Sequence, residues 1–258
     1  MRPKPRIITE QRPSREAAAL KIAKRKHAML ILDWMKSNVI SVPPDTSLLH
    51  CRKLFKEHQI SRLPVVDADK VVVGLISTSD IKEFSPQRTT GLEILEVLDM
   101  LGETMAKQIM TVDPTTINYK GTVEQAAIKM IERRVACLPV VNDEEKLVGI
   151  LTEWDIFKAL VSISGATIPT GVEMAFKLEN RRGTLHEILD RLKEYGVRIS
   201  TVLSIISDDS MRQVKIRFWS EDIAAEDNAL EELKKHAGLR YWARNGEVYL
   251  RDRPDFVL

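Results

Sequence analysis

The sequence is poor in the features that mark secreted or membrane-spanning chains. Its 258 residues include only two cysteines, Cys51 and Cys137, which are too few for a disulfide framework, so we expect buried free thiols. No apolar run reaches the roughly 18 residues that a membrane helix needs, and the Arg- and Pro-rich start has no apolar core of a secretory signal. We therefore expect a cytoplasmic protein that makes no membrane contact.

Motifs for catalysis and metal binding are also absent from the sequence. It contains no Gly-x-Ser-x-Gly, no Walker loop and no Gly-x-Gly-x-x-Gly. The five histidines are scattered and show no metal-ligand spacing. We expect no catalytic residue, no metal site and no required cofactor, and hence no enzyme.

Charge is spread unevenly along the chain, although the net charge is only +2. Residues 1–27 hold nine Lys or Arg against Glu10 and Glu16, so the remainder of the chain is acidic. Such a basic arm can bind nucleic acid or anionic lipid, or it can be a solvated tail. Because the arm has no Phe, Tyr or Trp for base stacking, we favour a solvated extension over residues 1–28. We expect a chain that begins at Met29 to fold.

What the chain does have is an internal repeat with an offset of 75 residues. The sequence around Pro64 recurs around Pro139, and Met35 aligns with Met110 without a gap. The same offset aligns residues 73–76 with 148–151 and Asp80 with Asp155. Two copies of one unit therefore occupy residues from about 30 to 160.

Each copy is predicted to fold as strand, helix, strand, strand, helix. In the second copy, Thr122 and Gln125 form a capping box before an apolar helix face of Val123, Ala126, Ala127, Met130 and Ile131. In the first copy, Asp45 and Thr46 are cap candidates before the stripe of Leu48, Cys51 and Phe55. Two apolar strands follow in each copy, joined by polar turns at 67–70 and 142–145. Because one small unit leaves an apolar face uncovered, we expect the two copies to pack together.

The remainder of the chain has a different pattern. Strict alternation predicts strands near 172–178, 199–205 and 214–218, and a last strand at 239–242. One helix follows a capping box of Thr184 and Glu187 and ends at Gly196, and a second carries Leu230 and Leu233. The predicted order is βαββαβ, which is ferredoxin-like.

The repeat pair resembles a tandem of cystathionine-beta-synthase (CBS) domains, a Bateman module. The resemblance is carried by the Leu-Pro-Val-Val and Gly-hydrophobic-hydrophobic-Ser/Thr-x-x-Asp patterns in both copies. The third segment resembles an ACT domain, a ligand-sensing and dimerising module, with Arg182 where that family often has proline. The order of these domains, CBS–CBS–ACT, is similar to that of AcuB-like proteins of acetoin utilisation. The expected fold class is α+β or α/β, with CBS domains at 29–84 and 105–164, a helical linker at 85–104 and a ferredoxin-like ACT domain at 170–250.

The candidate binding residues lie where a strand ends and a helix begins. An ionised Asp accepts hydrogen bonds from both ribose hydroxyls, a helix start and a hydroxyl suit phosphate, and the preceding glycine lets the backbone come close. The resemblance implies an adenosine ligand such as AMP, ADP, ATP or S-adenosylmethionine. The same residues also fit a helix capping box that needs no ligand. The expected nucleotide-binding residues are Ile40, Arg62, Ser77, Asp80, Thr115, Cys137, Thr152 and Asp155.

One difference between the copies bears on the expected clefts. Arg62 adds a cation beside one cleft where its repeat partner Cys137 cannot, so we expect unequal sites. We interpret Cys137 as a small buried apolar residue and not as a redox sensor. In the ACT-like segment, Asn180 and Gly183 mark either a ligand site or a tight turn.

We therefore expect a non-enzymatic regulator that senses an adenine nucleotide and acts on an unidentified partner protein. It is expected to form a homodimer through open sheet edges near 172–178 and 214–218. One alternative is a constitutive dimerisation scaffold with empty clefts. Another is a nucleic-acid-binding regulator that uses the basic arm, although we expect no nucleic acid partner.

Overall fold

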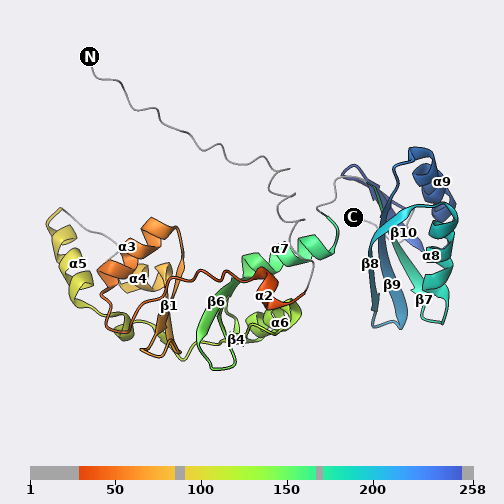
Figure 1. The fold of residues 1–258 in the computed structure, drawn as a ribbon. Coiled ribbons are helices and arrows are strands. Elements are labelled where there is room, and N and C mark those ends of the chain that lie inside the picture. Colours follow the sequence, from red (N-terminus) through yellow and green to blue (C-terminus); the bar gives the residue numbers. More distant parts are fainter. Residues whose placement is uncertain (1–28, 85–90, 167–170, 252–258) are drawn as a thin grey trace, which may run out of the picture. The chain divides into compact units, whose positions relative to one another are not determined.

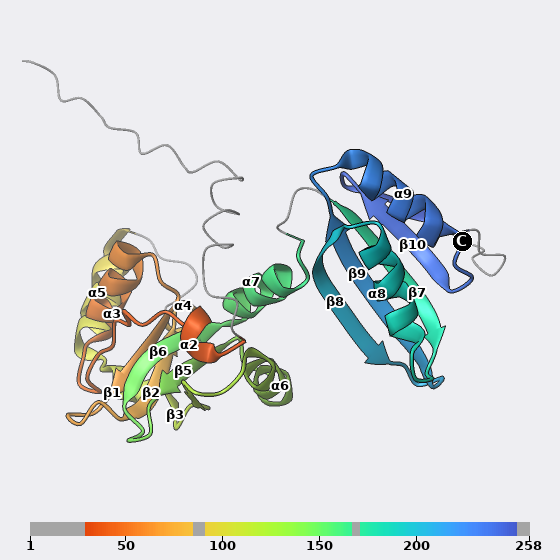
Figure 2. The same cartoon turned by 45° about the vertical axis from the view of Figure 1, so that its right-hand side comes forward.

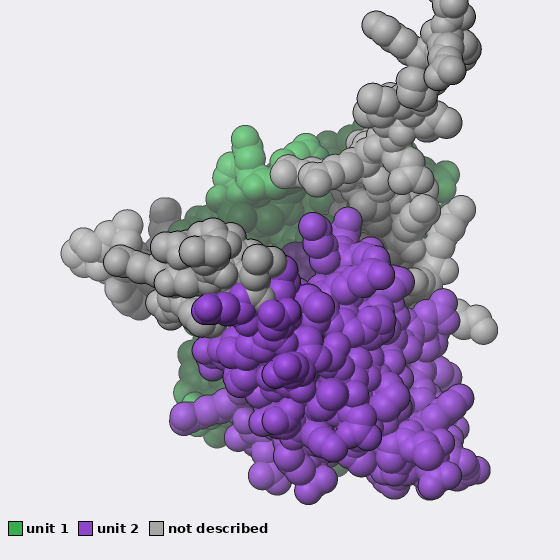
Figure 3. Space-filling model, turned by 90° about the vertical axis from the view of Figure 1, so that its left-hand side faces the viewer, with its two compact units in different colours: residues 1–24, 160–258 green, residues 25–159 purple. Residues whose placement is uncertain are grey.

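The computed structural model describes residues 29–84, 91–166 and 171–251 (Figure 1). The basic arm at 1–28 lies outside the described residues. The described residues up to 159, purple in Figure 3, form one compact unit, which is called the first unit. Those from 160 onward, green in Figure 3, form the second unit.

The first unit holds both copies of the repeat. The first copy and its approach comprise α2 (Ile31–Trp34), α3 (Leu48–His58), β1 (Arg62–Val66), β2 (Val72–Ser77) and α4 (Thr78–Phe84). The connection carries α5 (Gly91–Glu103) and η1 (Ala106–Gln108). The second copy and its approach comprise β3 (Thr111–Val112), β4 (Ile117–Asn118), α6 (Val123–Arg133), β5 (Cys137–Val141), β6 (Leu147–Thr152) and α7 (Glu153–Ile163). The helix that was predicted in the linker is α5.

The turns between the two strands of each copy have the same pattern of hydrogen bonds. In the turn between β1 and β2, Asp67 Oδ1 accepts from the N–H groups of Asp69 at 3.0 Å and Val71 at 2.9 Å. In the turn between β5 and β6, Asn142 Oδ1 accepts from the equivalent N–H groups at 3.0 and 2.9 Å. Asp and Asn side chains nucleate turns in this way. The repeat inferred from the sequence is thus confirmed in the local structure.

The segment that precedes each copy pairs with the sheet of the other copy. Strand β3, before the second copy, pairs with β2 of the first at Gly74 and Leu75. In the reciprocal contact, Lys36 exchanges backbone hydrogen bonds of 2.9 and 3.0 Å with Ile150 of β6. The copies are therefore joined by backbone pairing as well as by side-chain contact.

The repeated glycines make this exchange possible. An added Cβ would lie 2.2 Å from Met110 Sδ at Gly74 and 2.5 Å from Met35 Sδ at Gly149. Each glycine thus leaves space for a methionine of the other copy. The structure thus gives Gly74 and Gly149 a packing role, and the close approach of a ligand at these glycines stays a prediction.

Helix starts in the first unit agree only in part with the sequence. The capping box of α6 is confirmed, because Thr122 Oγ1 accepts from Gln125 N and Gln125 Oε1 accepts from Thr122 N. Helix α3 is capped by Ser47, which accepts from His50 N at 3.3 Å, so the prediction of Asp45 or Thr46 was wrong. Ile131, predicted on the buried face of α6, is 76% exposed.

The second unit is one antiparallel sheet with two helices. Its elements are β7 (Val172–Glu179), α8 (Thr184–Glu194), β8 (Arg198–Ile206), β9 (Met211–Trp219), α9 (Ile223–Lys234), β10 (Leu239–Arg244) and β11 (Glu247–Leu250). The strand order is β11-β10-β7-β9-β8. The predicted βαββαβ order is confirmed, but β7 and β9 are internal strands. The prediction that 172–178 and 214–218 offer open edges was therefore wrong, since the edges are β8 and β11.

Both helices cover the same face of this sheet (Figure 2). The core between them combines alternate residues of β7 and β9, such as Phe176 and Phe218, with Ile188 of α8 and Leu230 of α9. Burial of such side chains is the main stabilising contribution. The opposite face of the sheet is covered by neither α8 nor α9.

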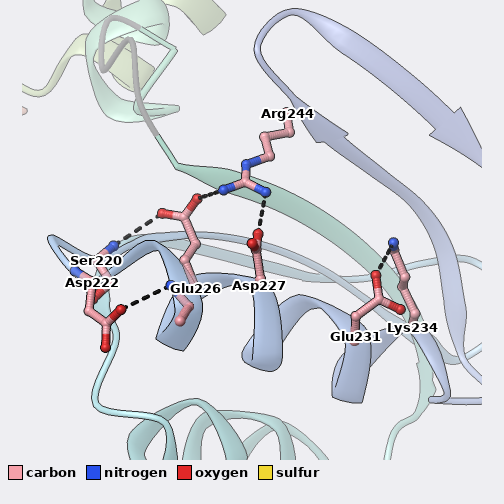
Figure 4. Close-up of polar contacts among 8 residues, drawn as sticks. Ser220, Asp222, Glu226, Asp227, Glu231, Lys234 and Arg244 are labelled. Atoms are coloured by element: carbon pink, nitrogen blue, oxygen red, sulfur yellow. Dashed lines mark hydrogen bonds and ion pairs between the residues drawn. The ribbon is translucent and has the colours of Figure 1, made fainter.

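Helix α9 is fixed to the sheet by a buried carboxylate (Figure 4). Glu226 accepts from Ser220 N at 3.1 Å and from Arg244 Nη2 at 2.8 Å. Arg244 also bonds Asp227 at 2.5 Å, and Asp222 caps the helix by accepting from Ala224 N. Because both oxygens of Glu226 have partners, this buried charge has a structural role.

Two features of the second unit differ from the sequence-based expectation. Gly183 is the N-cap of α8, and Thr184 Oγ1 donates to the carbonyls of Glu179 and Arg181, so the predicted Thr184–Glu187 capping box was wrong. The hairpin strand β11 was missed. Its signal was Asn245-Gly246, two residues with positive φ of 54° and 84° that favour a tight hairpin turn.

Candidate functional site

The first candidate site is the Asp80 junction, residues 77–80, where β2 passes into α4. Ser77 N donates to Asp80 Oδ2 at 2.6 Å, and Asp80 N donates to Ser77 Oγ at 3.2 Å. This is the reciprocal capping arrangement that the residue spacing allows. Ser77 is buried and Asp80 is half-buried. Within the described chain, only Oδ2 of Asp80 accepts a hydrogen bond, so Oδ1 remains available as an acceptor.

The Asp155 junction, residues 152–155, is its repeat partner between β6 and α7. Both the N–H and the hydroxyl of Thr152 donate to Asp155 Oδ2, at 3.0 and 2.6 Å. Lys158 Nζ lies 2.6 Å from Oδ1. Asp155 is 1% exposed. Burial alone would raise the pKa of Asp155, but the hydrogen bonds from Lys158 and Thr152 outweigh it and lower the pKa.

The junctions thus differ in how far their carboxylates are engaged. Both oxygens of Asp155 have protein partners, whereas one oxygen of Asp80 has one. The difference comes from Lys158, whose position in the first copy is held by Glu83. Sequence reasoning missed Lys158, although its place three residues after Asp155 on the same helix was the available signal.

Several helix-start amides that were expected to be free for phosphate are engaged within the protein. Thr78 N donates to Ser61 O at 3.2 Å, and Glu153 N donates to Ala136 O at 3.0 Å. The N–H groups of Ser77, Asp80 and Thr152 are engaged by the capping contacts above. A phosphate at either helix start would have to compete with these contacts, and its binding there stays a prediction.

The other predicted residues lie close to these junctions or in the core beside them. Ile40 packs against the hydrophobic core of the first copy, and Thr115 is half-buried just before β4. Arg62 and Cys137 pair across their hairpins with Ser77 and Thr152. These pairings bring Arg62 beside the Asp80 junction and Cys137 beside the Asp155 junction.

The electrostatics at Cys137 also involve Arg62. Burial raises the pKa of the Cys137 thiol to about 12, while the positive charge of Arg62 lowers it and Asp155 raises it. Arg62 therefore acts on the second copy as well as the first. A buried thiol with a pKa this high is protonated at neutral pH and has the character of a small apolar side chain.

In the second unit, the turn at 180–183 is exposed. Asn180 Oδ1 accepts from Arg212 Nη2 at 3.1 Å. Gly183 has a φ of 93°, and no heavy atom lies within 4 Å of its ideal Cβ position. The conformation alone thus accounts for glycine at this turn. Arg181, which precedes it, pairs with Glu187 at 3.0 Å.

The sequence of the first unit matches a known family twice. The family model of the CBS domain matches residues 31–86 and 106–162. The chain is 32% identical over 155 residues to the uncharacterized protein MJ1426 of Methanocaldococcus jannaschii, covering 52% of this chain and 92% of that protein. The chain belongs to the CBS-domain family. Its first unit is a tandem CBS pair, and the Asp80 and Asp155 junctions are equivalent positions of the two CBS domains.

Other relatives match this CBS pair over only part of their own length. Inosine-5'-monophosphate dehydrogenase of Korarchaeum cryptofilum is 32% identical over 53% of this chain, but the chain spans only 24% of that enzyme. The chloroplastic CBSX1 of Arabidopsis thaliana is 29% identical over 50% of this chain and 61% of its own length. The match to the enzyme is thus confined to a minor part of it.

Solved structures also match the CBS pair. CBSX2 in complex with AMP is 27% identical, with a TM-score of 0.44, and covers 53% of this chain and 99% of that one. CBSX2 from Arabidopsis thaliana gives a TM-score of 0.46 over 53% of this chain and 96% of that one. Because these TM-scores are below 0.5, we base the ligand proposal on the residues of this chain.

No group of three or more His, Cys, Asp or Glu side chains among the described residues is arranged to hold a metal ion. No helix in the described ranges is long and apolar enough to span a membrane.

Proposed function

We propose that the CBS pair is a non-enzymatic sensor of an adenosine-containing ligand, and that the Asp80 junction is its ribose-binding position. The observation that carries this proposal is the unengaged Oδ1 of a half-buried Asp80. An ionised carboxylate with a free oxygen can accept from a ribose hydroxyl while its other oxygen keeps the helix cap. The family resemblance implies AMP, ADP, ATP or S-adenosylmethionine, and Arg62 supplies a cation for phosphate.

The Asp155 junction is proposed as the weaker site. A ribose there has to replace the contact of Asp155 with Lys158 or with Thr152, each at 2.6 Å. Breaking a buried contact between charged groups costs free energy that the ligand must offset. Unequal sites therefore follow from Lys158, in addition to the predicted difference between Arg62 and Cys137.

Calorimetry on single variants of the full chain tests this assignment. Asp80→Ala should weaken binding of AMP or ATP about ten- to a hundredfold, since hydrogen bonds to a charged acceptor contribute about 1.5–3 kcal/mol. Asp155→Ala is the matched control and should change affinity less. Lys158→Ala frees Asp155 Oδ1 and should strengthen the second site. If the wild-type protein takes up no AMP, ADP, ATP or S-adenosylmethionine at millimolar concentration, the sensor proposal fails.

We infer that the second unit is a ferredoxin-like ACT domain, for dimerisation or for sensing a small ligand. Strands β10-β7-β9-β8 with two helices on one face support this proposal, as does the Asn180–Gly183 turn between β7 and α8. The domain boundaries, a cytoplasmic location and a role in acetoin utilisation stay proposals that rest on the sequence.

The second candidate function is a constitutive dimerisation scaffold. It is favoured by exposed apolar side chains on α6 and α7, among them Ile131 and Trp154, which are 76% and 68% exposed. A groove of about 380 Å³ between these helices is lined by Met130, Ile156 and Phe157. Exposed apolar patches of this kind mark interaction surfaces. We propose a homodimer, and a light-scattering mass that stays near 29.4 kDa over a wide concentration range would contradict it.

A further inference from the structure

The face of the second unit's sheet that bears no helix contains a groove of about 680 Å³. Its lining comes from four neighbouring strands, β8, β9, β7 and β10. The strand register places Leu203, Lys215, Ala175 and Tyr241 in one row across the sheet. Ala175 has the smallest side chain in this row, so the sheet is hollowed at its position. The Asn180–Gly183 turn is not part of the lining.

The cationic side chains that line the groove differ in whether a carboxylate compensates their charge. Lys215 lies 3.0 Å from Glu173, and Lys177 pairs with Asp209. Arg240 pairs with no carboxylate in the parts of the chain that the structure describes. Its Nε is buried and has no hydrogen-bond partner within those same parts. The charge of the Arg240 guanidinium is therefore not compensated by a described carboxylate, and an anionic oxygen in the groove would compensate it.

The β8 side of the groove is apolar. Leu203 and Ile205 line it, and Ile205 is 63% exposed. Covering these side chains with an apolar group gains free energy in proportion to the area removed from water. The groove therefore offers a cation toward one end and an apolar surface toward the other.

We propose that this groove binds a small carboxylate that carries an apolar tail and no ammonium group. The guanidinium of Arg240 matches a carboxylate in shape and charge, and the tail lies over Leu203 and Ile205. An ammonium group beside the carboxylate would lie near Arg240, whose charge no described carboxylate compensates, and it would be repelled. This ligand class differs from the amino acid that the ACT resemblance suggests, and the groove lies in the unit that holds neither Asp junction.

Calorimetry on the full chain with three six-carbon probes tests the proposal. Hexanoate has both features, hexanol lacks the carboxylate, and norleucine adds an ammonium group to the hexanoate skeleton. We expect hexanoate to bind at least about tenfold more tightly than either of the others, because one favourable charged contact contributes more than about 1.4 kcal/mol.

Substitutions locate the site. Arg240→Ala should weaken hexanoate binding about ten- to a hundredfold, and Ala175→Leu should abolish it by filling the groove. Arg191→Ala is the matched control, because Arg191 lies on α8 and pairs with Glu232, and it should leave affinity unchanged. Circular dichroism identifies any variant that fails to fold. If one of the two groove variants does not fold, the other variant and the relative affinities of the three probes test the proposal.

Three results of the binding measurements would overturn the proposal, and so would one result on the oligomeric state. The three binding results are absence of hexanoate binding at millimolar concentration, equal affinity for hexanoate and norleucine, and unchanged affinity in a folded Arg240→Ala variant. Protection of the groove by a second copy would also overturn it, and would be seen as a dimer that Ile205→Glu dissociates. Nucleotide binding at the Asp80 junction is measured separately, so the two proposals can fail independently.

Discussion

The methionine–glycine contacts between the two CBS domains allow a quantitative prediction. Gly74→Ala would place a methyl group 2.2 Å from Met110 Sδ, 2.9 Å from Cγ and 3.1 Å from Cε. Because all three atoms belong to one side chain, Met110 must move away from the sheet of the other copy. Overpacking of this kind costs about 1–3 kcal/mol. Replacing glycine in a strand returns roughly 0.5–1 kcal/mol, so the middle of the two ranges gives an expected net loss of about 1 kcal/mol.

A double-mutant cycle separates this clash from any other effect. Met110→Ala alone removes a half-buried side chain and should cost about 2 kcal/mol, the lower end for methionine truncation. In the double variant the added methyl group has space, so the two losses should not add. We expect a coupling free energy of about 1–2 kcal/mol in the compensating direction. Gly149→Ala with Met35→Ala repeats the cycle at the symmetry-related contact.

The measurement is urea-induced unfolding of the full chain followed by circular dichroism, with separate fits if the two compact units unfold separately. Gly102→Ala provides the matched control. Gly102 lies in α5 with no heavy atom within 4 Å of its ideal Cβ position, so the same substitution should stabilise by up to about 1 kcal/mol. A neutral or stabilising Gly74→Ala, or strictly additive losses in the cycle, would refute the role assigned to the glycines.

Three further predictions concern other buried or constrained positions. Glu173→Gln should cost about 3 kcal/mol, because Arg217 at 2.7 Å and Lys215 at 3.0 Å lose their carboxylate. Burial alone would raise the pKa of Glu173, but hydrogen bonds from Arg217, Lys215 and Tyr241 lower it. The stability that the ionised Glu173 contributes should therefore be complete above pH about 4.3, the unfolded pKa, and lost as the pH falls through the lower folded pKa. Urea midpoints that change equally with pH in wild type and Glu173→Gln would contradict this. Cys137, 3% exposed and with its pKa raised by burial to about 12, should react with a thiol reagent at pH 8 only on unfolding; rapid labelling of the folded protein would show otherwise. Gly183→Ala should cost only about 1–2 kcal/mol of backbone strain, since the space around its Cβ position is open, and a larger loss in urea unfolding would imply a contact not described here.

The CBS pair was predictable because the same sequence pattern occurs in it twice. Any single Leu-Pro-Val-Val run or Ser-x-x-Asp box is weak evidence, but two matches at one offset fix both the strands and the helix starts. The Asp67 and Asn142 turns illustrate this, since different side chains make the same pair of backbone contacts. Local interactions within about four residues explain these features, so one sequence is enough to find them.

What was not predictable depends on contacts between distant segments. Lys36 and strand β3 each pair with the sheet of the other copy through only one or two residues. Segments this short give no periodic signal in the sequence. The order β11-β10-β7-β9-β8 is set by packing, so alternation in β7 and β9 predicted strands without showing that they are internal. The same limit applies to Asp80 and Asp155. Their spacing predicted helix caps, but not which carboxylate keeps a free oxygen.

The positions at which the two copies differ therefore carry more functional information than those at which they agree. Turns, strand registers and the methionine–glycine contacts are shared, and they account for how the pair holds together. Lys158 against Glu83 and Arg62 against Cys137 are differences at the helix starts, and each changes the charge beside a junction. Under the proposed nucleotide-binding role, such differences should act mainly on what each junction can bind. A swap variant, Lys158→Glu with Glu83→Lys, should consequently exchange the ranking of the two junctions for an adenosine ligand, and calorimetry that shows the ranking unchanged would place the cause of the inequality elsewhere.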